Sequence, residues 1–271
     1  MTLIVQISDL HIKAPGRLAY GRVDTAEALR RAVEAINALD PQPAVVVISG
    51  DLVDRGGVEE YEHLCGLLAA IRVPIRVVPG NHDMRGPLRA ILGDFCDLVA
   101  GAGPVNWVMD FDWARIIGLD TSVPGAGHGH LSTASLAVLA RALDDRPDIP
   151  TMIVLHHPPV RLGIPGMDAD NLRNANALGQ ILQPHAGRLA LVCGHLHRAA
   201  STVFAGSSVI IAPGTSHAVL RAAEPPVRFA MEPPGYVLHS IMDGAWLAEF
   251  CPIGTFDGPY PFRGDDGKFL D

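Results

Sequence analysis

Five short apolar runs in this chain each end in side chains that commonly bind metal ions. Runs of this length, released by glycine or a polar turn, predict buried β-strands. The runs and the polar residues that follow them are residues 4–7 with Asp9 and His11, residues 45–48 with Asp51, residues 77–78 with Asn81, residues 152–155 with His156, and residues 191–193 with His195 and His197. A lone histidine at a strand end is usually a core residue, but five such ends are hard to explain by packing.

The spacing within these ends carries a geometric prediction. His195 and His197 stand two residues apart, and in extended backbone such residues project to the same side. Asp9 and His11 repeat the spacing at the end of the first run. We therefore expect each pair to converge on a point just beyond its strand.

The order of elements predicts the fold class. Strands alternate with helices in the first part of the chain, where Asp24 is typical of a helix N-cap and residues 58–71 carry an apolar stripe. Later segments are mostly strands. This pattern predicts an α/β protein, a four-layer α/β/β/α sandwich of two mixed sheets with the helices outside and a small β-rich C-terminal extension. In such folds, ligands gather at the carboxyl ends of the strands.

We expect residues 1–200 to form a catalytic core. Residues 201–271 are predicted to be a β-rich part that completes the second sheet and forms a cap or oligomerisation segment. His128 and His130 lie in a glycine-rich loop, and the sequence is compatible both with a place in a pocket wall and with a place on the surface.

Charge and composition exclude several classes of partner. The net charge is −8 with no basic cluster, which argues against a long nucleic-acid footprint. No apolar run reaches the length of a membrane span, and residues 1–3 lead straight into a strand, so we expect neither a membrane anchor nor a signal peptide. The scattered cysteines favour reduced thiols in a cytoplasmic protein over structural disulfides.

The candidate ligands suit two metal ions better than one. They are Asp9, His11, Asp51, Asn81, His156, His195 and His197. A single structural zinc takes four ligands, usually including cysteine, and no cysteine is well placed here. Seven nitrogen and oxygen ligands suit a metal pair if one carboxylate bridges it, and metal pairs about 3.5–4 Å apart are a common device for displacement at phosphorus.

In this order the same residues resemble the signature of the calcineurin-like metallophosphoesterases. The matching blocks are Asp9-Leu10-His11, Gly50-Asp51-Leu52-Val53-Asp54, Gly80-Asn81-His82-Asp83, His156 and Gly194-His195-Leu196-His197. Within that superfamily the chain is similar to bacterial class III cyclic-nucleotide phosphodiesterases and their glycerophosphodiesterase relatives. The features that support this are His156-His157-Pro158-Pro159, Tyr20-Gly21, and Pro213-Gly214-Thr215 followed by His217.

The resemblance implies how the ligands divide. The first metal would take Asp9, His11, Asp51 and His197, and the second Asp51, Asn81, His156 and His195, with Asp51 bridging. The ions would be Mn, Fe, Zn or Co, since a mixture of imidazole and carboxylate ligands binds all of these metals and does not distinguish between them. Asn81 brings no charge, so we expect the second site to bind its metal more weakly.

It also implies a reaction. A metal-bound hydroxide would hydrolyse a small phosphodiester, either a 3',5'-cyclic nucleotide or a glycerophosphodiester, with Asp51 and His82 as catalytic residues. His82 is the candidate proton donor, oriented by Asp83 or Asp54, although a purely electrostatic role stays open. His157 is expected to be structural. Substrate contacts are expected from Asn81, His82, Tyr20, His217 and Arg55; plain packing remains open for Tyr20 and His217, and a solvated loop arginine for Arg55.

Three other readings compete with this one. The protein would be a phosphomonoesterase or protein phosphatase, a DNA nuclease, or a non-catalytic metal-binding scaffold that keeps the fold. The acidic charge weakens the nuclease reading, and the retained His82 argues against a scaffold. We further expect a homodimer or larger homo-oligomer, by resemblance.

Overall fold

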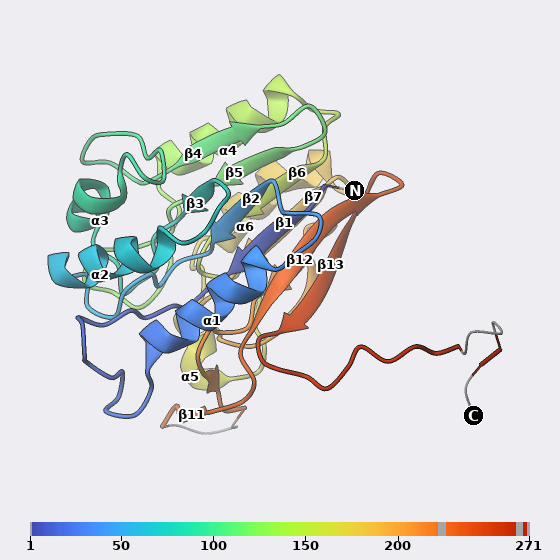
Figure 1. Ribbon diagram of the computed structural model, residues 1–271. Helices are drawn as coiled ribbons and strands as arrows, with labels where there is room; N and C mark the ends of the chain where they lie inside the picture. Colours follow the sequence, from blue (N-terminus) through green and yellow to red (C-terminus); the bar gives the residue numbers. More distant parts are fainter. Residues whose placement is uncertain (1, 222–225, 264–267, 270–271) are drawn as a thin grey trace.

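Two mixed β-sheets lie face to face at the centre of the protein in the computed structural model, which describes residues 2–221, 226–263 and 268–269 (Figure 1). The first sheet has the order β13-β12-β1-β2-β3, and the second the order β4-β5-β6-β7-β9-β8. The strands of the first sheet are β1 (Ile4–Ile7), β2 (Val45–Ile48), β3 (Ile75–Val77), β12 (Gly235–Met242) and β13 (Ala245–Pro252). Those of the second are β4 (Trp107–Asp110), β5 (Arg115–Gly118), β6 (Thr151–Val154), β7 (Leu189–Cys193), β8 (Ala200–Phe204) and β9 (Ser207–Ile211).

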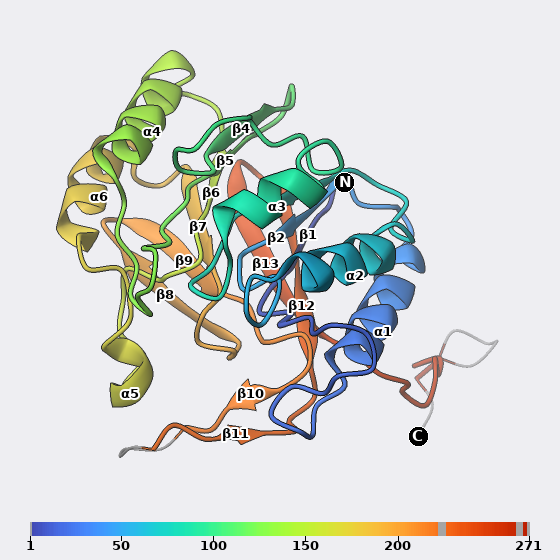
Figure 2. The same cartoon turned by 90° about the vertical axis from the view of Figure 1, so that its left-hand side faces the viewer.

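Helices cover the outer face of each sheet, so the predicted four layers are confirmed (Figure 2). The helices are α1 (Thr25–Asn37), α2 (Val58–Leu68), α3 (Arg85–Leu92), α4 (Thr133–Asp145), α5 (Pro165–Asp168) and α6 (Ala175–Leu182), with a 3₁₀ turn at Gln183–His185. Helices α1, α2 and α3 lie on the first sheet, while α4 and α6 lie on the second. Asp24 caps α1 by accepting a hydrogen bond from the Glu27 amide, as predicted.

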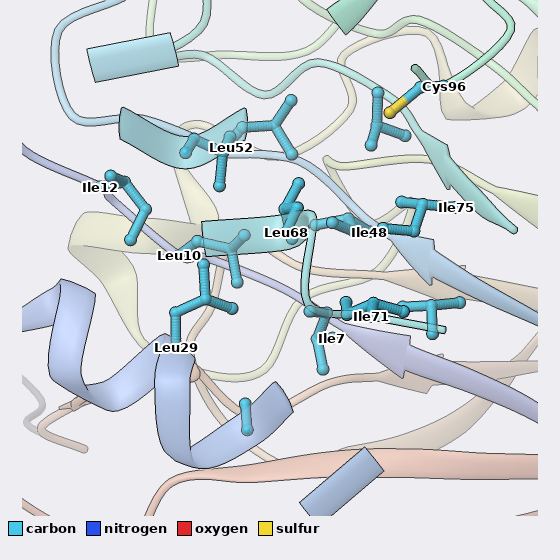
Figure 3. Close-up of a cluster of buried hydrophobic side chains, with 14 of the residues drawn as sticks. Ile7, Leu10, Ile12, Leu29, Ile48, Leu52, Leu68, Ile71, Ile75 and Cys96 are labelled. Carbon is cyan, nitrogen blue, oxygen red and sulfur yellow. The ribbon is translucent and has the colours of Figure 1, made fainter. Parts of the chain in front are cut away.

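Alternate residues of the central strands enter different apolar layers. In β2, Val46 and Ile48 pack under the helices of the first sheet, a cluster shown in Figure 3, whereas Val45 and Val47 face the second sheet. The second sheet behaves in the same way, with Ile153 toward its helices and Val154 toward the first sheet. Both faces of these central strands are therefore buried, which explains why the sequence shows continuous apolar runs there rather than alternation.

Parallel strands dominate the middle of both sheets. Strands β1, β2 and β3 are parallel, as are β5, β6, β7 and β9. The carboxyl ends of β1, β2, β3, β6 and β7 are the five ends singled out in the sequence.

The part after residue 200 divides between the two sheets. Strands β8 and β9 complete the second sheet, but β12 pairs antiparallel with β1 and so extends the first, with β13 beyond it. The prediction that the C-terminal part completes the second sheet is wrong for these two strands. The free side of β1 needs a hydrogen-bonding partner, and the apolar pattern of β12 does not specify which sheet it joins.

Two features lie outside the two large sheets. Strands β10 (Ala218–Val219) and β11 (Phe229–Ala230) form a small antiparallel pair. After β13, residues 253–263 run away from the body and expose Phe256, Tyr260 and Phe262 (Figure 1).

The predicted cap segment includes residues 222–225, 264–267 and 270–271, which lie outside the described residues. Among the helices of the described ranges, none has the length and apolar character needed to cross a membrane.

Candidate metal centre

All seven predicted ligands meet at the edge where the parallel strands of both sheets end. Asp9 and His11 follow β1, Asp51 follows β2, and Asn81 follows β3. His156 follows β6 of the other sheet, and His195 and His197 follow β7. The site is therefore built across the two sheets, and neither sheet holds it alone.

The ligand loops have left-handed backbone, not the extended backbone that the sequence predicts. The φ angles are +55° at Asp9, +46° at His11, +50° at Asp51, +71° at His195 and +50° at His197. For residues other than glycine this region is sparsely populated and typically costs 1–3 kcal/mol each. Backbone hydrogen bonds enforce it, including those from the amides of Asp9 and His11 to the carbonyl oxygens of Gly50 and Asp51, at 3.1 and 3.0 Å.

This backbone separates the paired ligands instead of stacking them on one side. His197 turns toward His11, with their Nε2 atoms 3.1 Å apart, whereas His195 turns toward Asn81, with Nδ1 3.2 Å from Oδ1. The prediction that His195 and His197 converge on a single point is wrong for that reason. The two histidines enter different ligand groups.

The first group holds Asp9, His11, Asp51 and His197, all buried, with one ligand atom of each within 4.8 Å of the others. His11 Nε2 lies 3.6 Å from Asp51 Oδ2, and His197 Nε2 lies 3.5 Å from Asp9 Oδ1. Burial holds the pKa of His11 well below its usual value and lowers that of His197 to about 4, so both rings are neutral near pH 7. Two imidazole nitrogens bound to one ion at about 2.0–2.1 Å would stand about 3 Å apart, so the observed spacing fits a shared metal.

The second group surrounds the Asn81 amide oxygen. Asn81 Oδ1 lies 3.2 Å from both His156 Nε2 and His195 Nδ1. His156 Nε2 lies 3.3 Å from Asp51 Oδ2. The second nitrogen of His156, Nδ1, donates to the Ser49 carbonyl oxygen at 2.8 Å, which directs the Nε2 lone pair into the group.

Asp51 stands between the two groups. Its Oδ2 atom approaches His11 on one side and His156 on the other, while Oδ1 accepts a hydrogen bond from the His82 amide at 3.0 Å. Burial would raise the pKa of Asp51, but the neighbouring histidines, His156 foremost, outweigh it and hold the pKa well below its usual value. An ionised oxygen facing both groups is the arrangement that a bridging carboxylate requires.

The remaining charges also fit cations. Burial, and then the Asp51 charge, raise the pKa of Asp9 to about 6, and its Oδ2 atom is buried without a hydrogen-bond partner. His156, between the two carboxylates, has its pKa raised to about 9 by Asp51 against the effect of burial. A proton on His156 thus supplies the positive charge that a bound metal would otherwise bring.

Two glycines make room for this arrangement. A Cβ atom on Gly80 would lie 2.1 Å from Asp51 Oδ1, and one on Gly194 would lie 2.0 Å from Ser8 Oγ. Both contacts are far below van der Waals distance, so the glycines of the G-N-H-D and G-H-x-H blocks are needed for close approach of the loops.

His82 lies beside the first group. Its Nδ1 donates to the Asp54 carbonyl oxygen at 2.7 Å, and its ring meets the His11 ring edge-on at 4.6 Å. Burial alone would lower the pKa of His82, but Asp51 and the Asp54 carbonyl raise it above its usual value. Asp83 does not orient His82, because its carboxylate accepts from the amides of Leu52 and Gly80 and from the Tyr61 hydroxyl.

His157 is placed as the sequence predicts, in a structural position. Its Nδ1 bonds to the Thr121 hydroxyl at 2.8 Å and its Nε2 to the Gly127 carbonyl oxygen at 3.0 Å. Both ring nitrogens are thereby occupied, although the ring lies near His156 and His195. The loop with His128 and His130 backs this ring, since a Cβ on Gly129 would lie 2.5 Å from His157 Cβ.

A cavity of about 370 Å³ opens over the metal centre. Tyr20 and His217, which the sequence names as candidate substrate contacts, lie on its wall with their rings 5.4 Å apart. The β10–β11 hairpin adds Phe229, whose ring lies 5.1 Å from Tyr20 and 5.3 Å from His217. Phe229 and Met167, also on this wall, were not foreseen, because neither stands in a motif or a periodic segment.

A second cavity, of about 640 Å³, lies against the other side of the Asn81–His82 loop. Arg55 is on its wall and not on the first, and the Arg55 side chain is 82% exposed. Asp54, which the sequence names as a possible orienting group for His82, also has Oδ1 3.7 Å from His11 Nδ1 and Oδ2 2.6 Å from Lys13 Nζ.

The chain is similar to known proteins along most of its length. A model of the calcineurin-like phosphoesterase family matches residues 2–199. A probable glycerophosphodiester phosphodiesterase GpdQ of Arcobacter nitrofigilis is 37% identical over 99% of this chain and all of its own length. The 3',5'-cyclic adenosine monophosphate phosphodiesterase CpdA of Escherichia coli K12 is 32% identical over 78% of this chain and 75% of its own.

A solved structure supports the fold alone. A dimetal phosphatase from Danio rerio superposes with a TM-score of 0.67 at 15% identity, covering 93% of this chain and 96% of the other.

Proposed function

This chain belongs to the calcineurin-like phosphoesterase family, and from that premise we propose that it hydrolyses small phosphodiesters at a pair of metal ions held by the two ligand groups. The substrate would be a glycerophosphodiester or a 3',5'-cyclic nucleotide, the classes named for its relatives. The observation that carries the proposal is the position of Asp51 Oδ2, 3.6 Å from a nitrogen of one group and 3.3 Å from a nitrogen of the other.

Seven side chains would hold the ions. Asp9, His11 and His197 would bind one and Asn81, His156 and His195 the other, with Asp51 shared. The mixture of imidazole and carboxylate donors suits Mn, Fe, Zn or Co. When bound, such a pair supplies positive charge for the phosphoryl oxygens and lowers the pKa of water, which is the chemistry that diester hydrolysis needs.

His82 would supply the proton that the leaving group needs. Its Nδ1 stays on the Asp54 carbonyl oxygen, so the proton carried by Nε2 is the one free to move. As the P–O bond to the leaving alcohol breaks, that oxygen takes the Nε2 proton and departs as a neutral alcohol. The raised pKa of His82 supports this role, because it keeps more of the ring protonated near pH 7.

Substrate contacts would come from both walls. Asn81 and His82 line both cavities and so would touch any diester at the centre. Tyr20 and His217 would line the path of one ester arm. Arg55 would act on the other side, in the second cavity, where its guanidinium is largely exposed although its Nε lies 3.8 Å from Asp54 Oδ2.

Hydrolysis by the metal-loaded protein tests the proposal directly. We expect higher kcat/KM on a phosphodiester than on the matching monoester. Asp51→Asn should lower kcat/KM by at least about a hundredfold, because loss of even an outer partner of a metal ligand costs about 10- to 100-fold. The metal content should fall below two ions per chain in the same variant.

His185→Ala, a substitution far from the strand ends, is the matched control and should leave both quantities unchanged. A strong preference for the monoester would replace this proposal with a phosphomonoesterase. Unchanged hydrolysis in Asp51→Asn would remove the metal centre from the reaction.

We also propose a cytoplasmic homo-oligomer. Its support is that Cys65, Cys96, Cys193 and Cys251 are free thiols, and that the segment after β13 exposes large aromatic side chains of the kind found at interfaces. Size-exclusion chromatography with light scattering checks the oligomer, and a monomer at micromolar concentration would contradict it.

A further inference from the structure

The two cavities meet at the same pair of residues. Asn81 and His82 line both cavities, and the first cavity is also lined by the proposed metal ligands His11 and His197. A phosphorus atom over the two ligand groups would therefore have a cavity on each side. His82 stands on the boundary between them.

The two flanks come from different parts of the chain. The first cavity is bounded by Tyr20, His217 and the β10–β11 hairpin with Phe229, beside the ends of β1 and β9. The second is bounded by the loops that follow β2, β3 and β5 and by Ala102, ahead of β4. Since β3 and β5 lie toward the opposite flank of the sheets from β12 and β9, the two cavities open in different directions from the centre.

Their walls differ in chemistry. The first wall carries aromatic rings and apolar side chains such as Met167, Val219 and Val227, with the exposed Arg228 at its edge. Among the described residues that line it, the second has no aromatic ring apart from His82; it carries Arg55, Asp54 and Ser122 beside Met84, Val123 and Pro124. Its other arginine, Arg85, is already committed to Asp120 at 2.6 Å and to the Ser122 carbonyl oxygen at 2.8 Å, which leaves Arg55 as the exposed cation on this wall.

A substrate with two separate alcohols uses such a site fully. In a 3',5'-cyclic nucleotide both ester oxygens belong to one ribose, so both arms leave phosphorus in the same direction. In an acyclic diester the two alcohols are independent and can enter different cavities. A wall with an exposed guanidinium, a carboxylate and a hydroxyl suits an arm rich in hydroxyls, because each hydroxyl both donates and accepts hydrogen bonds.

We propose that the cavity lined by Arg55, Ala102 and residues 122–125 is a subsite for a hydrophilic alcohol arm, such as glycerol, of an acyclic phosphodiester. The inference rests on the proposed phosphodiesterase function and narrows its substrate class. The aromatic cavity takes the other, less polar arm. His82, on the boundary, can reach the ester oxygen on either side.

Filling the second cavity tests the subsite without touching a metal ligand. Ala102 is exposed in the loop before β4, so Ala102→Trp places a ring over the cavity at little risk to folding. Val99→Trp, in the same loop but off the cavity wall, is the matched control. Val227→Trp narrows the aromatic cavity instead.

Two readouts are measured on the metal-loaded variants. Calorimetry compares glycerol 3-phosphate with methyl phosphate, which lacks the polyol. We expect Ala102→Trp to weaken glycerol 3-phosphate about tenfold, a loss of about 1.4 kcal/mol, with methyl phosphate unchanged. In steady-state kinetics, Ala102→Trp should raise KM for glycerophosphocholine about tenfold and change kcat little. This pattern shows that the lost contact stabilised the bound substrate and the transition state equally.

Arg55→Ala, a smaller change on the same wall, should weaken glycerol 3-phosphate in the same direction. If Val227→Trp weakens glycerol 3-phosphate and Ala102→Trp does not, the polyol occupies the aromatic cavity and the inference is wrong. Equal effects on both ligands, or none, also overturn it. Absence of diester hydrolysis in the unmodified protein would instead defeat the proposed function, so the two failures are distinct.

Discussion

His82 borders both cavities. Its Nδ1 atom is hydrogen-bonded to the Asp54 carbonyl oxygen at 2.7 Å and is therefore not a metal ligand. Its contribution should depend on the leaving group. An alkoxide leaves poorly without a proton, whereas a nitrophenolate is stable in water and needs none.

We therefore expect His82→Gln to slow hydrolysis of an alkyl diester about a hundredfold or more, and that of an aryl diester less than about tenfold. Steady-state kinetics on glycerophosphocholine and bis(p-nitrophenyl) phosphate provide the comparison. Equal losses on both substrates would assign His82 an electrostatic role in place of proton donation.

At this scale the sequence predicts identities better than conformations. The motif blocks name all seven side chains that meet at the strand ends, because residue type determines ligand chemistry. They do not reveal the left-handed backbone of Asp9 or His11, since hydrogen bonds to a loop distant in the sequence hold it there. The roles of Tyr20, His217 and Arg55 stay predictions.

The β10–β11 hairpin is tied to the ligand loop by Arg198, which directly follows His197. The Arg198 guanidinium donates to the Val219 carbonyl oxygen at 2.7 Å and pairs with Glu232 at 3.1 and 3.2 Å. These contacts hold the strand pair that carries Phe229 against the metal centre. Arg198 is in this sense a positioning residue for the aromatic wall.

Loosening this tie should affect substrate binding more than metal binding. We expect Glu232→Gln to raise KM for glycerophosphocholine by up to about fivefold, since half-exposed ion pairs contribute at most about 1 kcal/mol. Metal content should remain at two ions per chain, as measured by atomic absorption. A loss of metal in this variant would show that the hairpin supports the ligands themselves.

Elements with strong local signals were predictable from sequence, and those set by long-range pairing were not. Helix α4 begins where Ser132 caps it, with the Ser132 hydroxyl accepting from the Ser135 amide at 3.0 Å. Strands β10 and β11 contain two residues each, too short for any periodicity. Strand β12 joins β1 across more than two hundred residues of chain, which no local pattern reports.

A buried polar network links the two sheets behind the metal centre. Gln6 in β1 donates from Nε2 to Ser49 Oγ and to the Cys193 carbonyl oxygen of the second sheet, both at 2.9 Å. His239 in β12 completes it by donating from Nε2 to Gln6 Oε1 at 3.0 Å. Ser49 and Cys193 lie next to the ligand loops, so the network fixes the relative position of the two halves of the site.

His239 should make the stability of the whole molecule sensitive to acid. Burial lowers its pKa from 6.5 to about 3 in the folded protein. Below pH 6.5 the unfolded chain therefore binds a proton that the folded protein does not, and stability is lost as the pH falls from 6.5 toward 3. The loss from one such group is about 1.4 kcal/mol per pH unit, or about 2–3 kcal/mol at pH 4.5.

His239→Gln removes this titration and keeps a side-chain donor. Urea unfolding of the metal-free protein at pH 7.5 and 4.5 should show a smaller difference in the variant, by about 2–3 kcal/mol. The site histidines titrate in both proteins and cancel from the comparison. An unchanged difference would mean that His239 accepts a proton while the molecule stays folded.

The left-handed backbone at Asp9 and His197 costs conformational free energy, and what the protein gains from it is the ability to bind the metal ions. Glycine adopts those angles freely, so Asp9→Gly or His197→Gly relieves the distortion while deleting a ligand. Directed evolution of the metal-free protein for yield or heat tolerance alone would therefore favour variants that have lost a metal ligand. Any such campaign has to screen turnover in every round.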